Sequence, residues 1–433
     1  MDQTTLTPFA RPFQATITPP GSKSLTNRAL VMAALADGES MLSNVLFAED
    51  TEVMIGGLRA LGFKVKEDAK KATVSVEGLG GVVPASKADI QCANSGTTIR
   101  FLTAFCALGE GTYRLDGNAR MRERPIAELG MLLEELGAMV RYEAATGHPP
   151  VVVEAQGLRG GRAHFPSAHS SQYLSAVLMA APYARESDVL VELGPGQTSW
   201  PYVEMTARLM AHYGVTVGIA RDREEGRPTE IRVPREPYTA GDYEIEPDAS
   251  NATYFMAAAA AHPGASVRIP GLGEESLQGD VAFAGVLAEM GAEVSLAADA
   301  ISVSGPERLQ GIEVDMAPMP DAAMTLAALA ALADGPTTIR GLHTWRVKET
   351  DRLAALQAEL RKLGAGAAIE GDTLRIDPAE TVRPAEVETY DDHRMAMSFA
   401  VVGSRVPGIT ILGPDCVRKT YPGFFADLEK LRE

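Results

Sequence analysis

The chain has 433 residues, of which 45% are apolar and 22% charged, a composition that suits two globular domains of about 200 residues each. Its formal net charge of −17 argues against nucleic acid or an anionic membrane as a partner. Several cations nevertheless fall inside short polar motifs, which favours a small, strongly anionic ligand at those motifs.

The N-terminal segment and the cysteines favour a cytoplasmic protein. The first residues, MDQTTLTPFARPF, lack a basic stretch followed by an apolar core, so we expect no secretory signal. The apolar run from Tyr254 to Ala261 stops at His262, far short of the roughly 20 residues that span a bilayer. The three cysteines include no CxxC pair and cannot form a disulfide framework, so a reduced, cytoplasmic compartment fits best.

A unit made of a helix and then a strand repeats along the chain. A helical pattern that ends in Leu-x-x-Leu-Gly, or a close variant, precedes a strand pattern five times, and the five glycines are 75, 77, 77 and 73 residues apart. Glycine is the residue expected at the left-handed position just past a helix end. These glycines are Gly62, Gly137, Gly214, Gly291 and Gly364. A sixth copy, FFADLEKLRE, lies at the end of the sequence.

A second element accompanies each copy. A short polar loop opens an Ala-rich helix, and a turn then leads into an alternating strand. The six copies read GSKSLTNRALVMAALADGES, NSGTTIRFLTAFCALGEGTYRL, SSQYLSAVLMAAPYARESDVLVEL, DASNATYFMAAAAAHPGASVRI, DAAMTLAALAALADGPTTIRG and DDHRMAMSFAVVGSRVPGITIL. Each loop supplies Ser, Thr, Asn or Asp as a helix N-cap, and a capped helix start attracts anions. Capping alone would explain any one loop, but the first, second, third and sixth loops are also rich in charge or hydroxyl donors.

The repeats predict an α/β fold with six units, three in each of two domains. Proline and acidic residues interrupt the pattern near Pro20–Lys23 and near Asp242–Asp248. We therefore expect one discontinuous domain of residues 1–22 and 243–433 and a second domain of residues 23–242. Both crossings lie beside ligand-type loops, so we expect the active site in the cleft between the domains.

Nine polar motifs follow one another in a fixed order along the chain. They read PPGSKSLTNRA, NSGTTIR, RMRERPI, SSQYL, SWPY, PDAAMT, RVKETDRL, DDHRMAM and RKTYP. The first is not a nucleotide-binding P-loop, because Ser22 separates Gly21 from Lys23 where the pattern requires G-K. From about residue 15 to residue 425, the nine motifs together resemble the EPSP synthase family. This resemblance implies two inside-out α/β barrel domains, each of three βαβαββ repeats, joined by two crossover segments.

The resemblance also implies two small-molecule substrates, shikimate 3-phosphate and phosphoenolpyruvate. The positions that match the family's contacts to shikimate 3-phosphate are Lys23, Ser24, Arg28, Ser170, Ser171, Gln172, Ser199, Tyr202, Asp321, Thr344 and Lys348. The positions that match its contacts to phosphoenolpyruvate are Lys23, Asn94, Gly96, Thr97, Arg124, Gln172, Arg352, Arg394 and Lys419. Clustered Arg and Lys suit this pair, because the two substrates together bring four anionic groups into one site.

The family's activity is the transfer of the enolpyruvyl group of phosphoenolpyruvate to the 5-hydroxyl of shikimate 3-phosphate, with release of phosphate by addition and elimination. The step belongs to the shikimate pathway to chorismate and the aromatic amino acids. By resemblance, Glu349 and Lys23 handle the protons on the methylene and leaving-group sides, and Asp321 removes the hydroxyl proton. In isolation, Asp321 would more often be a helix N-cap than a catalyst.

The stretch RVKETDR has two interpretations. If it is helical, Lys348 and Arg352 share one face, where their like charges repel unless an anion binds between them. The alternative is a surface helix that Glu349 and Asp351 neutralise.

Three positions depart from the family pattern. Thr344 stands where many members carry Asn, and Trp200, where many carry a polar residue, is assigned no role. Phe101 stands where several members carry proline, so the helix start with Gly96 and Thr97 is expected to sit differently. Gly96 itself favours an open phosphoenolpyruvate pocket, and sensitivity to the phosphoenolpyruvate mimic glyphosate stays open.

We expect no cofactor, since the seven histidines lack metal-ligand spacing and no GxGxxG motif follows a strand. A monomer is compatible with the repeats. Two alternatives stay open. The sister transferase that acts on UDP-N-acetylglucosamine shares the repeats, but its Lys-Asn pair is replaced here by Lys23-Ser24, and residues 120–124 contain no cysteine. A non-catalytic repeat protein that binds phosphorylated ligands would be expected to lack Asp321 and Glu349.

Overall fold

The structure is a computed structural model that describes residues 2–144, 147–166 and 170–432. The chain divides into two units. Unit 1 consists of Met1–Pro20 and Glu246–Glu433, and unit 2 consists of Gly21–Ile245. Each unit has three sheets among its described residues, and the same pairing pattern recurs from sheet to sheet.

Unit 2 repeats one strand pairing three times. In each sheet the first strand runs parallel to the second, and the third and fourth strands continue antiparallel, in the orders β14-β3-β5-β4, β6-β7-β9-β8 and β10-β11-β13-β12. The strands are β3 (Asp37–Ser43), β4 (Lys64–Asp68), β5 (Thr73–Leu79), β6 (Lys87–Gln91), β7 (Glu110–Asp116), β8 (Met139–Tyr142), β9 (Val151–Gln156), β10 (Gly161–Phe165), β11 (Val189–Leu193), β12 (Gly218–Arg221), β13 (Pro228–Val233) and β14 (Tyr243–Glu244). The helices are α1 (Lys23–Leu35), α2 (Glu49–Ala60), α3 (Gly96–Cys106), α4 (Ala127–Glu135), α5 (Ser171–Ala180) and α6 (Trp200–His212), with short 3₁₀ turns η1 (Met121–Glu123) and η2 (Ala181–Tyr183).

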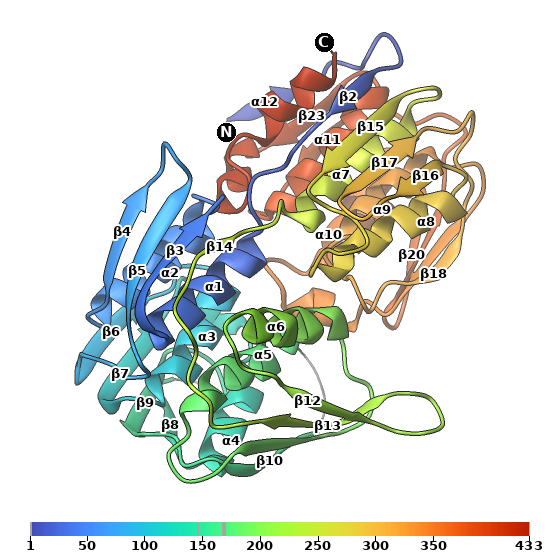
Figure 1. The fold of residues 1–433 in the computed structure, drawn as a ribbon. Helices are drawn as coiled ribbons and strands as arrows, with labels where there is room; N and C mark the ends of the chain where they lie inside the picture. Colours follow the sequence, from blue (N-terminus) through green and yellow to red (C-terminus); the bar gives the residue numbers. More distant parts are fainter. Residues whose placement is uncertain (1, 145–146, 167–169, 433) are drawn as a thin grey trace. The chain divides into compact units, whose positions relative to one another are not determined.

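The Ala-rich helices lie at the centre of unit 2. In α3 all residues are buried, and α1 and α5 are buried beyond their first turns. These three helices contact one another, while the sheets lie outside them (Figure 1). Small side chains allow this close helix packing, because they let the helix backbones approach. The helix-inside, sheet-outside order is the inside-out arrangement expected from the sequence.

Unit 1 is built in the same way. Its sheets have the orders β2-β15-β17-β16, β18-β19-β21-β20 and β22-β23-β1. The strands are β1 (Gln3–Thr5), β2 (Gln14–Thr16), β15 (Ser266–Pro270), β16 (Glu293–Leu296), β17 (Ala300–Ser304), β18 (Glu313–Asp315), β19 (Thr337–Arg340), β20 (Gly366–Glu370), β21 (Thr373–Asp377), β22 (Ala385–Glu388) and β23 (Ile409–Leu412). The helices are α7 (Ala249–Ala261), α8 (Phe283–Glu289), α9 (Ala323–Leu329), α10 (Arg352–Lys362), α11 (His393–Arg405) and α12 (Phe424–Glu429), with 3₁₀ turns η3 (Gly279–Ala282), η4 (Ala330–Leu332), η5 (His343–Val347), η6 (Pro414–Lys419) and η7 (Lys430–Arg432).

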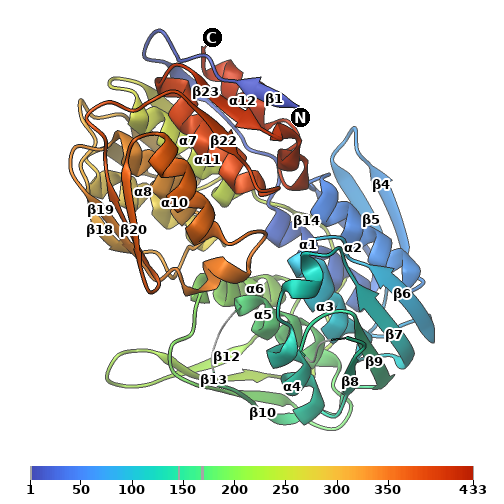
Figure 2. The same ribbon diagram turned by 180° about the vertical axis from the view of Figure 1, so that it is seen from behind.

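The sixth repeat is completed by the start of the chain. Strand β23 runs parallel to β22 and antiparallel to β1, so that Gln3 lies opposite Leu412 (Figure 2). In the same unit, α7, α9 and α11 form the buried central group and contact one another. The N-terminal residues therefore belong to the same unit as the C-terminal half of the chain.

The helix ends test two predictions. The five repeat glycines have φ of +95°, +98°, +92°, +97° and +90° just past α2, α4, α6, α8 and α10, which confirms their left-handed position. Side chains cap five of the six central helices, at Ser22, Ser95, Ser170, Asp248 and Asp392. The predicted cap is wrong for α9, whose N-cap is Ala322, because the neighbouring Asp321 is engaged by arginines instead.

The described residues contain no helix that is both long and apolar enough to span a bilayer. The thiols of Cys92, Cys106 and Cys416 are free, and the first two are buried. Within the same described ranges, His, Cys, Asp and Glu side chains form no group of three that could hold a metal ion.

Candidate active site

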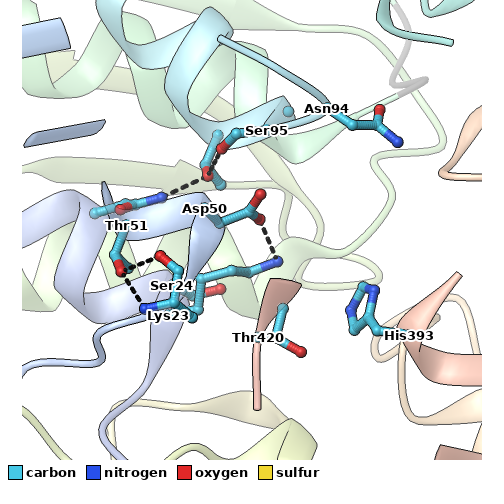
Figure 3. A network of polar contacts seen from close by, with 12 residues as sticks. Lys23, Ser24, Asp50, Thr51, Asn94, Ser95, His393 and Thr420 are labelled. Atoms are coloured by element: carbon cyan, nitrogen blue, oxygen red, sulfur yellow. Dashed lines mark hydrogen bonds and ion pairs between the residues drawn. The ribbon is translucent and has the colours of Figure 1, made fainter. Parts of the chain in front are cut away.

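In unit 2, Lys23 is fixed by a carboxylate that the sequence did not single out. Lys23 is the first residue of α1, and its Nζ lies 3.2 Å from Oδ2 of Asp50. Figure 3 shows the lysine side chain reaching toward that carboxylate. Asp50 is buried in the first turn of α2, and the Lys23 side chain is only 13% exposed. The pair holds a cationic ammonium group at the start of α1.

Arg28 is fully buried one turn further along α1. Its guanidinium donates to Oγ1 of Thr206 at 2.7 Å, to Oγ of Ser175 at 3.2 Å and to the carbonyl of Ser24 at 2.9 Å. It lies 5.0 Å from the centroid of the Phe101 ring, which gives this departure from the family pattern a packing role. Burial lowers the Arg28 pKa to about 10. In the described part of the chain its partners are all neutral, so this charge attracts an anion.

Two arginines lie against the start of α3. Nη1 of Arg124 donates to the carbonyl and to Oδ1 of Asn94, both at 3.2 Å. A Cβ on Gly96 would lie 2.5 Å from Nη1 of Arg100 and 2.7 Å from Nη2 of Arg124. Arg124 itself is extended, and α4 begins only at Ala127. Glycine leaves room here for both guanidinium groups, which a larger residue would force to shift.

Arg100 holds Gln172, a predicted substrate-binding residue, in place. Its Nη1 donates to Oε1 of Gln172 at 2.9 Å, and its Nη2 donates to the carbonyl of Pro125 at 3.0 Å. Gln172 follows Ser170, whose Oγ accepts from the Gln172 backbone, and the buried Ser171 is the first residue of α5. The sequence could not show this role, because it depends on the packing of α3 against α5.

The remaining predicted residues of unit 2 lie on the same helix starts or on α6. Oγ1 of Thr97 accepts from Nδ2 of Asn27 at 2.7 Å, which joins α1 to α3. Ser199 precedes α6 with a left-handed φ of +52°, and Tyr202 lies in the first turn of that helix. Trp200 donates to Glu204 at 2.7 Å. The bonds from α1 to α3, from α1 to α5 and from α3 to α5 join the N-terminal halves of the three central helices.

In unit 1, Arg352 is the centre of a buried ion-pair network. Its Nε lies 2.8 Å from Oδ2 of Asp392, its Nη1 2.8 Å from Oδ1 of Asp321 and its Nη2 2.9 Å from Oε2 of Glu349. Burial lowers the pKa of Arg352, but the three carboxylates together raise it above its ordinary value. The network therefore contains a permanent cation and both predicted acid/base carboxylates.

Asp321 joins two arginines. Its Oδ2 lies 2.9 Å from Nη2 of Arg394, and Nη1 of Arg394 donates to the hydroxyl of the buried Tyr254 at 3.2 Å. Burial acts to raise the Asp321 pKa, but the charges of Arg394, Lys348 and Arg352 outweigh it and hold that pKa well below its usual range. Asp321 is therefore an ionised carboxylate at neutral pH.

The stretch RVKETDR is not one helix. The turn η5 ends at Val347, Lys348 is extended, and Asp351 caps α10, which begins at Arg352. Both interpretations of this stretch assumed one helix, and that condition is not met, because Asp351 caps a new helix that begins after Lys348. Thr344 is buried in η5, and its Oγ1 has no hydrogen-bond partner among the described residues.

The sequence missed three residues that hold predicted ones in place. Asp50 binds Lys23, Asp392 binds Arg352, and Tyr254 binds Arg394. Asp392 carried a signal, because it belongs to the DDHR motif and stands where a helix N-cap is expected. Asp50 and Tyr254 carried none, since they lie in an ordinary helix start and in an Ala-rich helix. Lys419, the last predicted cation, is buried at the end of η6.

Known proteins resemble the chain over its whole length. The family model for EPSP synthase (3-phosphoshikimate 1-carboxyvinyltransferase) matches residues 10–428. A 3-phosphoshikimate 1-carboxyvinyltransferase from Nostoc punctiforme is 45% identical over 433 residues, covering 100% of both chains. The chloroplastic 3-phosphoshikimate 1-carboxyvinyltransferase of Arabidopsis thaliana is 45% identical over 427 residues, covering 95% of this chain and 81% of that protein.

A solved structure has a similar fold over the whole chain. The EPSP synthase of Acinetobacter baumannii superposes with a TM-score of 0.80 at 26% identity, covering 100% of this chain and 98% of that one. The likeness confirms the predicted α/β fold of two inside-out domains. Sequence, fold and the family motifs thus agree, and the chain belongs to the EPSP synthase family.

Proposed function

We propose that this chain transfers the enolpyruvyl group of phosphoenolpyruvate to the 5-hydroxyl of shikimate 3-phosphate and releases phosphate. Full-length similarity to 3-phosphoshikimate 1-carboxyvinyltransferases supports this activity, and it places the chain in the shikimate pathway to chorismate and the aromatic amino acids. The observation that carries the proposal within the structure is Arg28, a fully buried cation whose described partners are all neutral. A bound phosphate or carboxylate would supply the missing negative charge.

The residues of unit 2 suit recognition of both substrates. Arg28, Ser24 and Ser170 offer a guanidinium and hydroxyls for the phosphate of shikimate 3-phosphate, with Ser171, Gln172, Ser199 and Tyr202 as further contacts. Lys23, Arg124 and the helix start at Asn94, Gly96 and Thr97 offer cations and backbone N–H groups for phosphoenolpyruvate. The bonds among α1, α3 and α5 support this division, because they hold these groups in fixed positions.

The residues of unit 1 suit binding of phosphoenolpyruvate and contact with shikimate 3-phosphate beside Asp321. Arg352, Arg394 and Lys419 are buried cations for the carboxylate and phosphate of phosphoenolpyruvate. Lys348 and Thr344 are the proposed contacts to shikimate 3-phosphate beside Asp321. The proposed reaction requires residues of both units, since neither set alone contains all the cations and all the acid/base groups.

The proposed chemistry proceeds in two balanced steps. First, an acid protonates the methylene carbon of phosphoenolpyruvate, the 5-hydroxyl oxygen bonds to C2, and its proton passes to a base. Second, the resulting tetrahedral adduct loses a proton from the new methyl group while the bond from C2 to the phosphate oxygen breaks. We assign the hydroxyl proton to Asp321, and the methylene and leaving-group protons to Glu349 and Lys23.

The electrostatics of Asp321 fit a base that is strengthened by substrate. Three cations hold its pKa low in the protein alone, which makes it a weak proton acceptor. Anionic substrate groups bound to Arg394, Lys348 or Arg352 would offset those cations and raise the Asp321 pKa. The carboxylate would then accept the hydroxyl proton only when phosphoenolpyruvate is in place.

The proposal is tested by phosphate release from the purified protein mixed with shikimate 3-phosphate and phosphoenolpyruvate, with each substrate omitted in turn. Phosphate should appear only when both are present. No release from a folded protein would contradict the substrate assignment. Release when UDP-N-acetylglucosamine replaces shikimate 3-phosphate would instead establish the sister activity, which the family and the curated relatives do not favour.

We further propose that the enzyme acts as a monomer in the cytoplasm, without cofactor, nucleic acid or membrane. The free thiols and the acidic net charge support this proposal. Size-exclusion chromatography with light scattering, at the concentrations used for assay, should give the mass of one chain.

A further inference from the structure

Unit 1 contains a cavity of about 730 Å³ at the C-terminal end of its central helices. The ends of α7, η4 and α11 line it, together with the loops that follow β17 and β21. Its apolar wall includes Ala261, Pro263, Leu309, Ala331 and Val382. The proposed substrate residues Asp321 and Arg394 lie at the other, N-terminal end of the same helices. The cavity is thus separate from the proposed active site, and its volume suits a small organic ligand.

In unit 2, side chains pack closely around the end of one central helix, α5. The segment APYAR (residues 181–185) follows α5 as AALAD (residues 330–334) follows α9. The Tyr183 ring lies so close to Gly81 that a Cβ there would be 2.1 Å from it, and Arg185 crowds Gly157 in the same way, at 2.0 Å. The guanidinium of Arg235 donates to the carbonyls of Ala184, at 2.7 Å, and Arg185, at 2.6 Å. A phenol ring and two guanidinium groups therefore occupy the helix end in unit 2.

Unit 1 has different side chains in the equivalent segment. Leu332 stands at the position of Tyr183, and Asp334 at the position of Arg185. The aromatic ring is replaced by a smaller side chain and the cation by an acid. At these two positions unit 1 therefore has more space than unit 2 and a negative charge in place of a positive one.

The charges around the cavity favour a cation. Of its charged lining residues, three are acidic, Glu307, Asp334 and Glu380, and two are basic, Arg308 and Arg405. Asp334 is paired with Arg308 at 3.3 Å, whereas Glu307 and Glu380 form no ion pair within the described residues. The C-terminal ends of three helices add partial negative charge. Arg405 is the one basic residue of the lining that is not paired with an acidic residue of the lining. The lining is net acidic, with an apolar floor.

We propose that this cavity binds a small organic cation with a flat apolar body, an arylalkylamine or aryl guanidine. Such a ligand supplies to unit 1 the ring and the positive group that Tyr183, Arg185 and Arg235 supply to unit 2. Its ring lies against the apolar wall, and its ammonium or guanidinium group lies near Glu307 and Glu380. This inference does not rest on the proposed function, since it concerns binding at the other end of the helices.

The test uses calorimetric titration of the full chain, with saturating shikimate 3-phosphate present, and tyramine as the probe. 4-Hydroxyphenylacetate, which has the same ring and the opposite charge, is the matched ligand. Tyramine should bind in a saturable way, and at least about fivefold more tightly than the anion, because two exposed carboxylates each contribute up to about 1 kcal/mol. The Glu307→Gln/Glu380→Gln double variant should reduce that preference to about one.

Two further variants complete the test. Leu332→Tyr places in unit 1 the ring that unit 2 already has, and it should abolish tyramine binding. Glu289→Gln, an exposed acid on α8 outside the cavity, should change nothing. The proposal is overturned if tyramine does not bind to the unmodified chain, if the anion binds equally well, or if the double variant keeps the preference for the cation. Should Leu332→Tyr fail to fold, the two exposed Glu→Gln changes still decide the matter.

Discussion

Replacing Gly96 by alanine should weaken phosphoenolpyruvate binding far more than shikimate 3-phosphate binding. The added Cβ would lie 2.5 Å from Nη1 of Arg100 and 2.7 Å from Nη2 of Arg124, and ordinary van der Waals contact begins at 3.4 Å. The two guanidinium groups must therefore retreat by about 0.9 Å and 0.7 Å. The bonds from Nη1 of Arg124 to Asn94, now 3.2 Å long, are already at the long end of hydrogen-bonding distance and should weaken when the guanidinium group shifts.

The magnitude follows from the value of a hydrogen bond to a charged group. Each such bond contributes about 1.5–3 kcal/mol, so a displaced Arg124 should raise the KM for phosphoenolpyruvate about 10- to 100-fold. Arg28 does not touch Gly96, so the KM for shikimate 3-phosphate should rise far less, only through the shift of Arg100 against Gln172. We expect kcat to change by no more than about threefold, because the lost contact acts on bound substrate and transition state alike.

Steady-state phosphate release, with one substrate varied at a time, measures all three constants. Gly56→Ala is the matched control, because Gly56 lies in α2 with open space around it, and this change should leave both KM values unaltered. Equal rises in the two KM values for Gly96→Ala would refute the reasoning, as would an unchanged KM for phosphoenolpyruvate. An unchanged KM would mean that Arg124 does not serve phosphoenolpyruvate, and equal rises would mean that its effect is not specific to that substrate.

Three further predictions concern buried charges. Phe101→Leu removes the ring beneath Arg28 and should raise the KM for shikimate 3-phosphate about 3- to 30-fold, as steady-state kinetics would show, since a cation–π contact contributes about 0.5–2 kcal/mol. Asp392→Asn removes a carboxylate from Arg352 and should lower the free energy of unfolding by about 3–5 kcal/mol, measured by urea denaturation. Burial raises the Asp280 pKa from 3.8 to about 6, so below pH 4 the folded and unfolded carboxyls are both protonated and this penalty is absent. It grows as the pH rises from about 4 to about 6, where the unfolded carboxyl is ionised and the folded one is still protonated, and it levels off at about 3 kcal/mol by pH 7. The difference in free energy of unfolding between Asp280→Asn and the unmodified chain should therefore increase from pH 4 to pH 7.

Controls separate these effects from general damage. Phe101→Tyr keeps an aromatic face and should restore the KM for shikimate 3-phosphate, whereas a KM that stays high would contradict the role given to the ring. Asp299→Asn, at an exposed site, should show no pH-dependent difference, and a flat profile for Asp280→Asn would show that the buried carboxyl is not destabilising. If Asp392→Asn leaves stability unchanged, Arg352 does not depend on that ion pair.

Features that depend on local sequence were predictable. The five glycines past the outer helices report a backbone requirement that each residue meets alone, and all five have positive φ. The caps at Ser22 and Asp392 are equally local, because a side-chain oxygen bonds a backbone N–H two or three residues ahead. The repeat count followed from their regular spacing, and with it the two-domain organisation.

Features that depend on packing between repeats were not predictable in the same way. Asp50 and Lys23 meet because α1 packs beside α2, and Arg100 reaches Gln172 because α3 packs beside α5. Neither pair has a fixed sequence spacing. The stretch from Lys348 to Arg352 stayed open for a different reason, since Asp351 can be a neutralising charge on a helix or, as in the structure, a helix cap. The same composition fits both interpretations, and only the backbone distinguishes them.

The central claim is that this chain joins the two substrates through an adduct in which the methylene carbon of phosphoenolpyruvate becomes a methyl group. Proton NMR of the reaction in D₂O tests it directly. The account predicts the enolpyruvyl product and phosphate in equal amounts, with deuterium in the vinyl group of the product, because the methyl group loses one of three hydrogens during elimination. Product without deuterium would contradict the addition–elimination route, and formation of pyruvate and phosphate alone would contradict the transfer itself.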